Sequence, residues 1–280
     1  MGNEPLPSAY GTQTIQRAVY LLRLLTSHNR RGLRLVDLTA MTEMERPTVH
    51  RILEALITEG LVVREGATKK YHLGPVLYEM SLAASPRYQL RDLCQAHLQA
   101  VAESTGDTVF LIVRSGFDSV CIDRKDGGFP VRVSTRDVGQ HLPLGLGAGG
   151  LAILAALPDE TMEGVLAVNI ERQAYSRAAI TVKELRRRIR LTREMGYVAK
   201  TVDGAPGVRA IALAIPGSES GALSVSALSP RLSGPRGDKV LATMRRAVWN
   251  IATMVRNSCI DGRAVPLITM PRREMPLGDE

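Results

Sequence analysis

The stretch "ERPTVHRILEALITEG", from Glu45 to Gly60, decides the fold of the first part of this chain. Pro47 suits the first turn of a helix, where its missing N–H costs nothing, and Gly60 suits a helix end. The apolar residues between them recur at the spacing of one helical face. These residues are Val49, Ile52, Leu53, Leu56 and Ile57. The pattern predicts an amphipathic helix.

The other face of this helix carries polar and basic side chains close to its start: Arg46, Thr48, His50 and Arg51. A helix that enters the major groove of DNA must offer donors to phosphates and base edges from its first turns. The free N–H groups and positive dipole end of the helix N-terminus also favour phosphate. We therefore predict that these four residues contact DNA.

The flanking sequence completes a small domain over residues 12–74. Residues 12–28 predict a helix with a stripe of apolar residues, and residues 33–42 predict a second, shorter helix. After Gly60 the period changes, and "LVVRE" and "KKYHL" predict two strands joined by "GAT". Three helices followed by a hairpin predict a winged helix-turn-helix. The expected stripe of the first helix is Ile15, Ala18, Val19, Leu22 and Leu25.

The charge of this region supports an anionic partner. From Thr12 to Pro75 there are ten Lys/Arg and six Asp/Glu, a net charge of +4, and the whole chain carries +8. We expect the hairpin to place Arg64, Lys69 and Lys70 against the DNA backbone. Acidic residues such as Glu54 would oppose phosphate, so a module that packs against another protein is the alternative.

The rest of the chain predicts an α+β domain with a largely antiparallel sheet, because hairpin-linked strands are followed by helices and further strands. We expect a flexible segment over residues 1–11, a linker helix within 75–89, this second domain over 90–258 and a polar tail over 259–280. Its strands are expected within 107–125, at 129–135, and at 197–202, 208–216 and 221–228. Its helices are expected at 87–106, 149–157, 159–169, 181–196 and 237–256.

Other features limit the function classes. Cys94, Cys121 and Cys259 are widely spaced and form no Cys-x-x-Cys pair, which argues against a zinc site or a disulfide framework and favours the cytoplasm. The chain starts without a signal-peptide pattern, and no apolar run has the length of a membrane span. No Ser/His/Asp set, paired carboxylates or metal-ligand spacing stands out. We expect no catalytic residues, no metal and no cofactor.

Several stretches resemble the IclR family of bacterial transcriptional regulators: "RAVYLLRLL", "LVDLTAMTEMERPTVHRILEALITEGLVVRE", "KKYHLG", "GQHLPLGLGAGGLAILAALP", "DGAPGVRAIALAIP" and "GALSVSALSPRL". The resemblance runs from about Thr12 to Met254. It implies a GAF-like effector-binding domain after the winged helix-turn-helix, and dimers that pair into tetramers. It also implies operator binding, as a repressor or an activator, under the control of a small organic acid, an aliphatic or aromatic carboxylate.

By position, the resemblance also implies six residues of the effector pocket: Ala148, Gly149, Asp203, Ala210, Ser224 and Ser226. Physical reasoning adds support, because the glycine-rich start of a helix exposes unpaired N–H groups to an anion. Ser224 and Ser226 alternate along a predicted strand, so both hydroxyls point to one face. The alternative is that this serine pair faces solvent.

The rival interpretation is a nucleotide-dependent enzyme. Residues Gly145–Gly150, "GLGAGG", satisfy the pattern G-x-G-x-x-G, and Glu171 has roughly the spacing of the acidic residue in a dinucleotide fold. That fold needs a buried strand before the glycines and a parallel strand after the helix. The preceding "TRDVGQHLPL" makes a poor buried strand, because it holds polar residues and a proline. We therefore favour the DNA-binding regulator.

Overall fold

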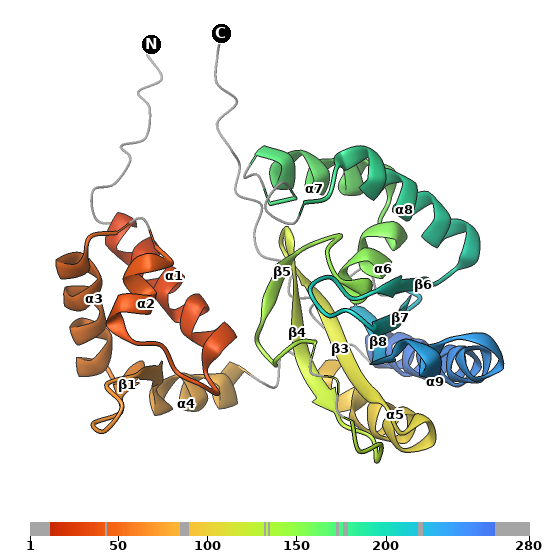
Figure 1. The fold of residues 1–280 in the computed structure, drawn as a ribbon, viewed down its shortest axis with the longest axis horizontal. Helices are drawn as coiled ribbons and strands as arrows, with labels where there is room; N and C mark the ends of the chain where they lie inside the picture. The colour runs from red at the N-terminus through yellow and green to blue at the C-terminus, as the bar shows by residue number, and fades with distance from the viewer. Residues whose placement is uncertain are drawn as a thin grey trace, which may run out of the picture. The chain divides into compact units, whose positions relative to one another are not determined.

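The computed structural model divides the chain into two compact units, Met1–Pro86 and Arg87–Glu280 (Figure 1). It describes residues 12–42, 44–84, 90–131, 133, 135–171, 174–175, 179–217 and 221–260. The predicted N-terminal segment, residues 85–89 of the linker and nearly all of the predicted tail lie outside these ranges. Over the described ranges, no helix has the length and apolar character that crossing a bilayer requires.

The first unit is a winged helix-turn-helix, as the sequence predicts. Its elements are α1 (Thr12–His28), α2 (Leu35–Ala40), α3 (Arg46–Thr58), β1 (Val62–Arg64), β2 (Tyr71–Leu73) and α4 (Pro75–Ala84). β1 and β2 pair antiparallel, and Leu33 adds an isolated antiparallel bridge to Tyr71. The bridge ties the chain before α2 to the hairpin.

The core of this unit follows the predicted stripe of α3 but not that of α1. Val49, Ile52, Leu53 and Leu56 are buried, as predicted. In α1, Leu21 and Leu25 are fully buried, whereas Ile15 and Val19 are 64% and 41% exposed. The prediction for α1 was therefore wrong at these two positions. Apolar residues occupy more than one face of α1, and packing against α3 and β2 selects the face with Leu21 and Leu25.

The second unit is built on a six-stranded antiparallel sheet in the order β5-β4-β3-β8-β7-β6. Its two long central strands, β3 and β8, bring together segments more than a hundred residues apart in the sequence. The strands are β3 (Thr108–Ser115), β4 (Asp118–Lys125), β5 (His141–Pro143), β6 (Val198–Thr201), β7 (Val208–Ala214) and β8 (Gly221–Leu228). This sheet confirms the predicted fold class.

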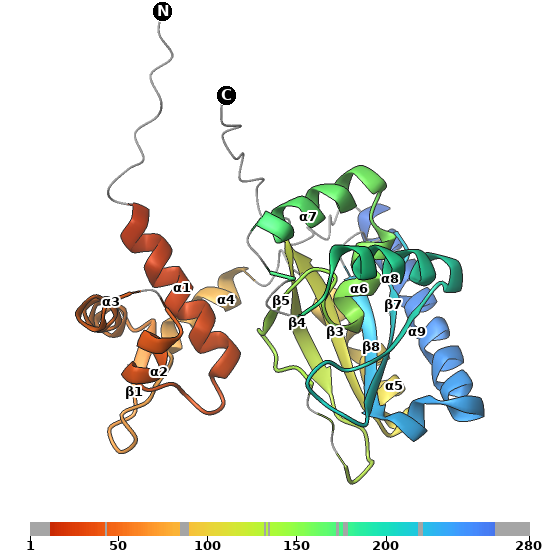
Figure 2. The same cartoon turned by 45° about the horizontal axis from the view of Figure 1, so that its top comes forward.

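Helices cover both faces of the sheet (Figures 1 and 2). One face packs on α5 and α9, and the opposite face packs on α6, with α7 and α8 beyond it. A short 3-10 helix, η2 (Ser229–Leu232), joins β8 to α9. The helices are α5 (Leu90–Thr105), α6 (Ala148–Ala156), α7 (Asp159–Glu171), α8 (Val182–Met195) and α9 (Gly234–Ile260).

One predicted strand was wrong. The described residues within 129–135 form no strand, and Val131 is 52% exposed. The third strand of this part of the sheet is instead β5, within the stretch that looked too polar for a buried strand. β5 pairs only with β4, at the edge of the sheet, and its three residues are half-buried. An edge strand can be short and polar, because one side is not covered by another strand.

Packing fixes the position of α6 on the sheet. A β-carbon at Gly149 would lie 2.6 Å from Cγ1 of Ile112 in β3, so only glycine allows this close approach. At the other end of α6, Arg193 donates to the carbonyls of Ala155 and Leu157 at 2.8 and 3.0 Å. These contacts hold both ends of α6, and the first turn lies directly against β3.

Candidate functional site

The exposed face of α3 carries the residues predicted to contact DNA. Arg46, His50 and Arg51 are exposed, and Thr48 is half-buried. Among the described residues, Arg46 and Arg51 have no hydrogen-bond or ion-pair partner, so both guanidinium groups are available to an anion. His50 Nε2 lies 3.7 Å from Glu54 Oε1 on the next turn. The Glu54 carboxylate therefore lies beside His50 on the face predicted to contact DNA.

The three hairpin residues that were predicted to contact DNA have different surroundings in the structure. Arg64 is exposed, with its guanidinium 5.5 Å from the centre of the Tyr71 ring. Lys69 is exposed on the turn and has a positive φ of 57°. Lys70 is half-buried, and its Nζ donates to the carbonyl of Arg31 at 2.7 Å. Lys70 thus fastens the hairpin to the turn that follows α1, whereas Lys69 and Arg64 remain at the surface.

The second unit contains a cavity of about 220 Å³ between the sheet and the start of α6. All six residues predicted for the effector pocket line it, although they come from α6, β7, β8 and the turn after β6. Its apolar wall includes Phe110 and Ile112 of β3 and Leu142 of β5. The cavity is smaller than a typical drug-sized pocket, which is roughly 300–1,000 Å³. It suits a small molecule.

The start of α6 forms one wall of this cavity. Gly147 precedes the helix with a φ of 68°, and no side chain caps the helix there. The N–H groups of the first helical turn have no partner within the helix. Ala148 and Gly149 belong to this turn and line the cavity. The helix start therefore presents donors and a positive dipole end to the cavity.

Two serines of β8 form part of the polar wall. Ser224 and Ser226 are 5% and 3% exposed, so the alternative of a solvent-facing pair was wrong. Ala210 of β7 lies opposite Ser226 in the ladder. The Oγ of Ser226 accepts a hydrogen bond from the Thr135 hydroxyl at 3.2 Å. Ser226 thus already has one partner, and its own hydroxyl proton can serve a ligand.

A lysine and an aspartate in the cavity wall neutralise each other. Lys200 Nζ lies 2.5 Å from a carboxylate oxygen of Asp203, and both residues line the cavity. The side chain of Lys200 is 13% exposed and that of Asp203 is 68% exposed. Sequence reasoning selected Asp203 but not Lys200. The pair contributes no net charge to the cavity.

Sequence reasoning also missed Arg136, a buried arginine that lines the cavity. It is 8% exposed, and its Nη2 donates to the Oγ of Ser119 at 3.0 Å. Its Nε is buried without a hydrogen-bond partner. Burial lowers the pKa of Arg136 to about 10, an effect that Cys121 and Asp118 partly oppose, so the group is still protonated at neutral pH. In the sequence, nothing separates Arg136 from the exposed arginines.

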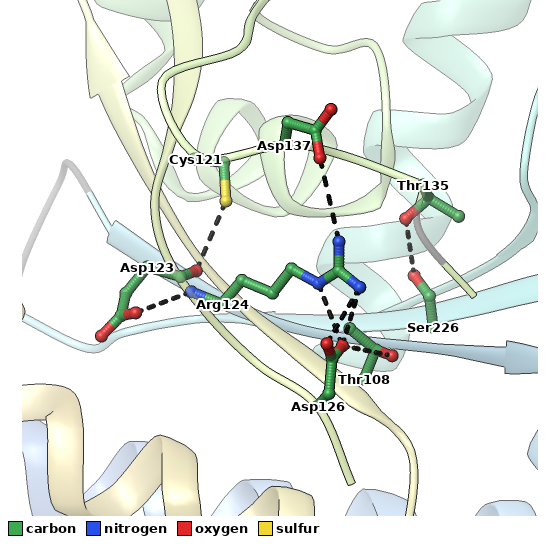
Figure 3. A network of polar contacts seen from close by, with 8 residues as sticks. All are labelled: Thr108, Cys121, Asp123, Arg124, Asp126, Thr135, Asp137 and Ser226. Carbon is green, nitrogen blue, oxygen red and sulfur yellow. Dashed lines mark hydrogen bonds and ion pairs between the residues drawn. The ribbon is translucent and has the colours of Figure 1, made fainter. Parts of the chain in front are cut away.

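A polar network holds the segment that carries Arg136 (Figure 3). Arg124 of β4 pairs with Asp126 at 2.8 Å and lies 3.8 Å from Asp137. On the other side of Arg136, Thr135 bonds to Ser226. Both neighbours of Arg136 are therefore tied to the sheet.

The arrangement required by the rival dinucleotide interpretation is not formed. Every pair of neighbouring strands in the described sheet is antiparallel, so no parallel strand follows the glycine-rich helix. Within the described residues, no group of three His, Cys, Asp or Glu could hold a metal ion. Burial raises the pKa of the Cys121 thiol to about 11, so it is not a thiolate at neutral pH.

Comparison with protein families gives two matches. Residues 14–66 match the IclR helix-turn-helix domain, and residues 83–253 match the family described as bacterial transcriptional regulator IclR C-terminal. Together these matches cover most of the described chain.

Two curated transcriptional regulators are similar to this chain. The chain is 33% identical over 164 residues to the HTH-type transcriptional regulator TtgV of Pseudomonas putida, a match that covers 59% of this chain and 62% of TtgV. It is 26% identical over 237 residues to the HTH-type transcriptional regulator XynR of Escherichia coli, covering 83% of this chain and 91% of XynR.

Solved structures share the fold. A regulator of the same family from Alicyclobacillus acidocaldarius superposes with a TM-score of 0.68 at 24% identity, covering 86% of this chain and 98% of that one. An IclR homologue from Microbacterium hydrocarbonoxydans, crystallised in complex with 4-hydroxybenzoate, gives a TM-score of 0.64 at 21% identity, covering 88% and 100%.

Proposed function

This chain belongs to the IclR family of bacterial transcriptional regulators, and from that premise we propose that a small organic acid controls its binding to operator DNA. The first unit would bind the operator, and the cavity of the second unit would bind the acid. The observation that carries the proposal is the gathering of all six expected pocket residues around one cavity beside an uncapped helix start.

In the proposed DNA complex, α3 enters the major groove. Arg46 and Arg51 are exposed and have no partner among the described residues, so they would contact phosphates or base edges together with Thr48 and His50. Arg64 and Lys69 of the hairpin would contact the backbone on the flank. Contacts with the DNA backbone add affinity that depends on the salt concentration but not on the base sequence.

In the proposed effector complex, the carboxylate of the ligand lies at the start of α6. The N–H groups of Ala148 and Gly149 and the hydroxyls of Ser224 and Ser226 would donate to it, and Ala210 and Asp203 would border the rest of the molecule. Charge-assisted hydrogen bonds of this kind contribute about 1.5–3 kcal/mol each. The homologue with bound 4-hydroxybenzoate supports an aromatic carboxylate as one ligand type.

We further propose that the active species is a homodimer or homotetramer that acts in the cytoplasm. Helix-turn-helix regulators that dimerise bind two half-sites one helical turn of DNA, or a multiple of it, apart. The operator should therefore be a pseudo-palindrome.

The test starts with selection of a duplex from a random library by the full chain. Fluorescence anisotropy then measures its affinity, with a scrambled duplex as the control and with salt varied. The same titration is repeated with 4-hydroxybenzoate, benzoate, propionate and succinate. An acid that acts as effector should change operator affinity about 5- to 150-fold, the usual range of allosteric coupling. If acids bind the protein but none of them changes its affinity for the operator, the proposed control through the cavity is refuted.

A further inference from the structure

Arg136 forms no ion pair with any described residue, and the Asp118 carboxylate acts on it only from beyond ion-pair distance. The only hydrogen bond of Arg136 in the described part of the chain is to the neutral hydroxyl of Ser119. The Cys121 thiol is protonated at neutral pH because burial raises its pKa to about 11. A buried charge is costly unless it is paired.

The position of Arg136 points to a ligand as the missing partner. Arg136 is one of the residues that line the cavity. A β-carbon at Gly147 would lie 4.0 Å from its Nη2, so the group stands beside the residue that precedes α6. The positive end of the α6 dipole and a full positive charge therefore act on the same part of the cavity.

We propose that Arg136 is the carboxylate anchor of this cavity and that it makes the site selective for monoanionic acids over neutral molecules of the same shape. This inference rests on the proposed function, since it names the ligand class of that same pocket. Arg136 forms an ion pair with the carboxylate, which also accepts hydrogen bonds from the first turn of α6.

The charges of the residues that line the cavity favour a ligand with a single negative charge. Lys200 and Asp203 neutralise each other at 2.5 Å, so Arg136 leaves one unbalanced positive charge among the lining residues. One carboxylate balances it. A second carboxylate on the ligand would have to compete with Asp203 for Lys200 or stay unpaired, so dicarboxylates bind more weakly.

The network around Arg136 prepares it for this role. Thr135 bonds to Ser226 and Asp137 lies beside Arg124, so the residues on both sides of Arg136 are tied to the sheet (Figure 3). The guanidinium is therefore held at the cavity before a ligand arrives. A preorganised cation loses less freedom on binding than a mobile surface side chain does.

Arg209 provides a matched control. It lies on β7 next to Ala210, and its Nε is also buried without a hydrogen-bond partner. Alternation along the strand directs Arg209 away from the cavity that Ala210 lines, and its Nη1 donates to Ser233 at 3.2 Å. Replacing Arg209 removes a comparable arginine without touching the cavity.

The experiment uses acids paired with their amides: benzoate with benzamide, and 4-hydroxybenzoate with 4-hydroxybenzamide, with acetate and formate as minimal carboxylates. Calorimetry and thermal shift at constant ionic strength are applied to the wild type, R136M, R136K and R209M. We expect the wild type to prefer an acid over its amide about 10- to 100-fold. R136M should lose this preference, R136K should keep part of it, and R209M should keep all of it.

Three results would overturn the proposal: equal binding of acids and amides by the wild type, unchanged preference in R136M, or no response of the wild type to any of the carboxylates. The acid and amide comparison in the wild type does not depend on the folding of a variant. Ligand-free R136M should melt at or above the melting temperature of the wild type. A clearly lower melting temperature would mean that Arg136 stabilises the fold rather than waiting for a ligand. Acids that bind through Arg136 without changing operator affinity would refute only the proposed regulation.

Discussion

The two adjacent lysines of the hairpin should respond differently to replacement by alanine. Lys69 is exposed on the turn, whereas the Nζ of Lys70 donates to the Arg31 carbonyl at 2.7 Å. We expect Lys69→Ala to remove a phosphate contact and Lys70→Ala to loosen the attachment of the hairpin to the turn that follows α1. Lys69 has a φ of 57°, and alanine is as strained there as lysine, so the backbone should be unaffected by the first change.

The size of the Lys69 effect follows from counterion release. Each phosphate contact on duplex DNA contributes about −0.9 to the slope of log affinity against log salt. Relative to 1 M salt, one contact therefore supplies about 0.9 log units at 0.1 M, or roughly eightfold in affinity. Lys69→Ala should flatten the slope by about 0.9 and weaken specific and non-specific duplexes alike. Lys70→Ala should leave the slope nearly unchanged and lower the melting temperature.

The assay is fluorescence anisotropy with the selected duplex and a scrambled duplex at four or more salt concentrations, alongside thermal melts of each variant. The reasoning would be refuted if Lys70→Ala flattened the slope as much as Lys69→Ala. An effect of Lys69→Ala on the selected duplex alone would mean that the hairpin reads bases rather than phosphates.

Three further predictions follow from the two sites. Arg51→Ala should weaken operator binding by about 1–3 kcal/mol, and Arg51→Lys should restore non-specific affinity but not sequence preference, as competition anisotropy will show. The double change Ser224→Ala and Ser226→Ala should weaken benzoate binding at least about tenfold in calorimetry, and equal affinity would move the carboxylate elsewhere. Gly149→Asp should destabilise the second unit by about 1–3 kcal/mol in denaturant titrations, because its β-carbon would meet Ile112 at 2.6 Å; unchanged stability would contradict this packing.

Much of the first unit could be predicted from the sequence because its elements are local. The stripe of α3 from Val49 to Leu56 repeats within a few turns, and Gly60 marks the change of period before the hairpin. The same periodicity failed for α1, because Ile15 and Val19 are as apolar as Leu21 and Leu25. Only packing against α3 and β2 distinguishes the two faces.

The cavity, too, depends on contacts between segments that are distant in the sequence. The family resemblance selected residues of α6, β7 and β8, and the structure brings them to one cavity. The strand expected at 129–135 was wrong, because pairing with β4 rather than local propensity decides that β5 forms at His141–Pro143.

The sequence by itself determined the order of the elements, the amphipathic pattern of α3 and the positive charge of the first unit, because these depend on residues that are neighbours in the chain. Only the tertiary structure distinguishes Lys70 and Arg136 from the other basic residues. Lysine and arginine account for 36 residues of the chain, and each carries the same charge wherever it stands. What separates them is the desolvation and the partners that folding imposes from distant segments. Lys70 donates to the carbonyl of Arg31, and Arg136 is buried with no ion pair to a described residue.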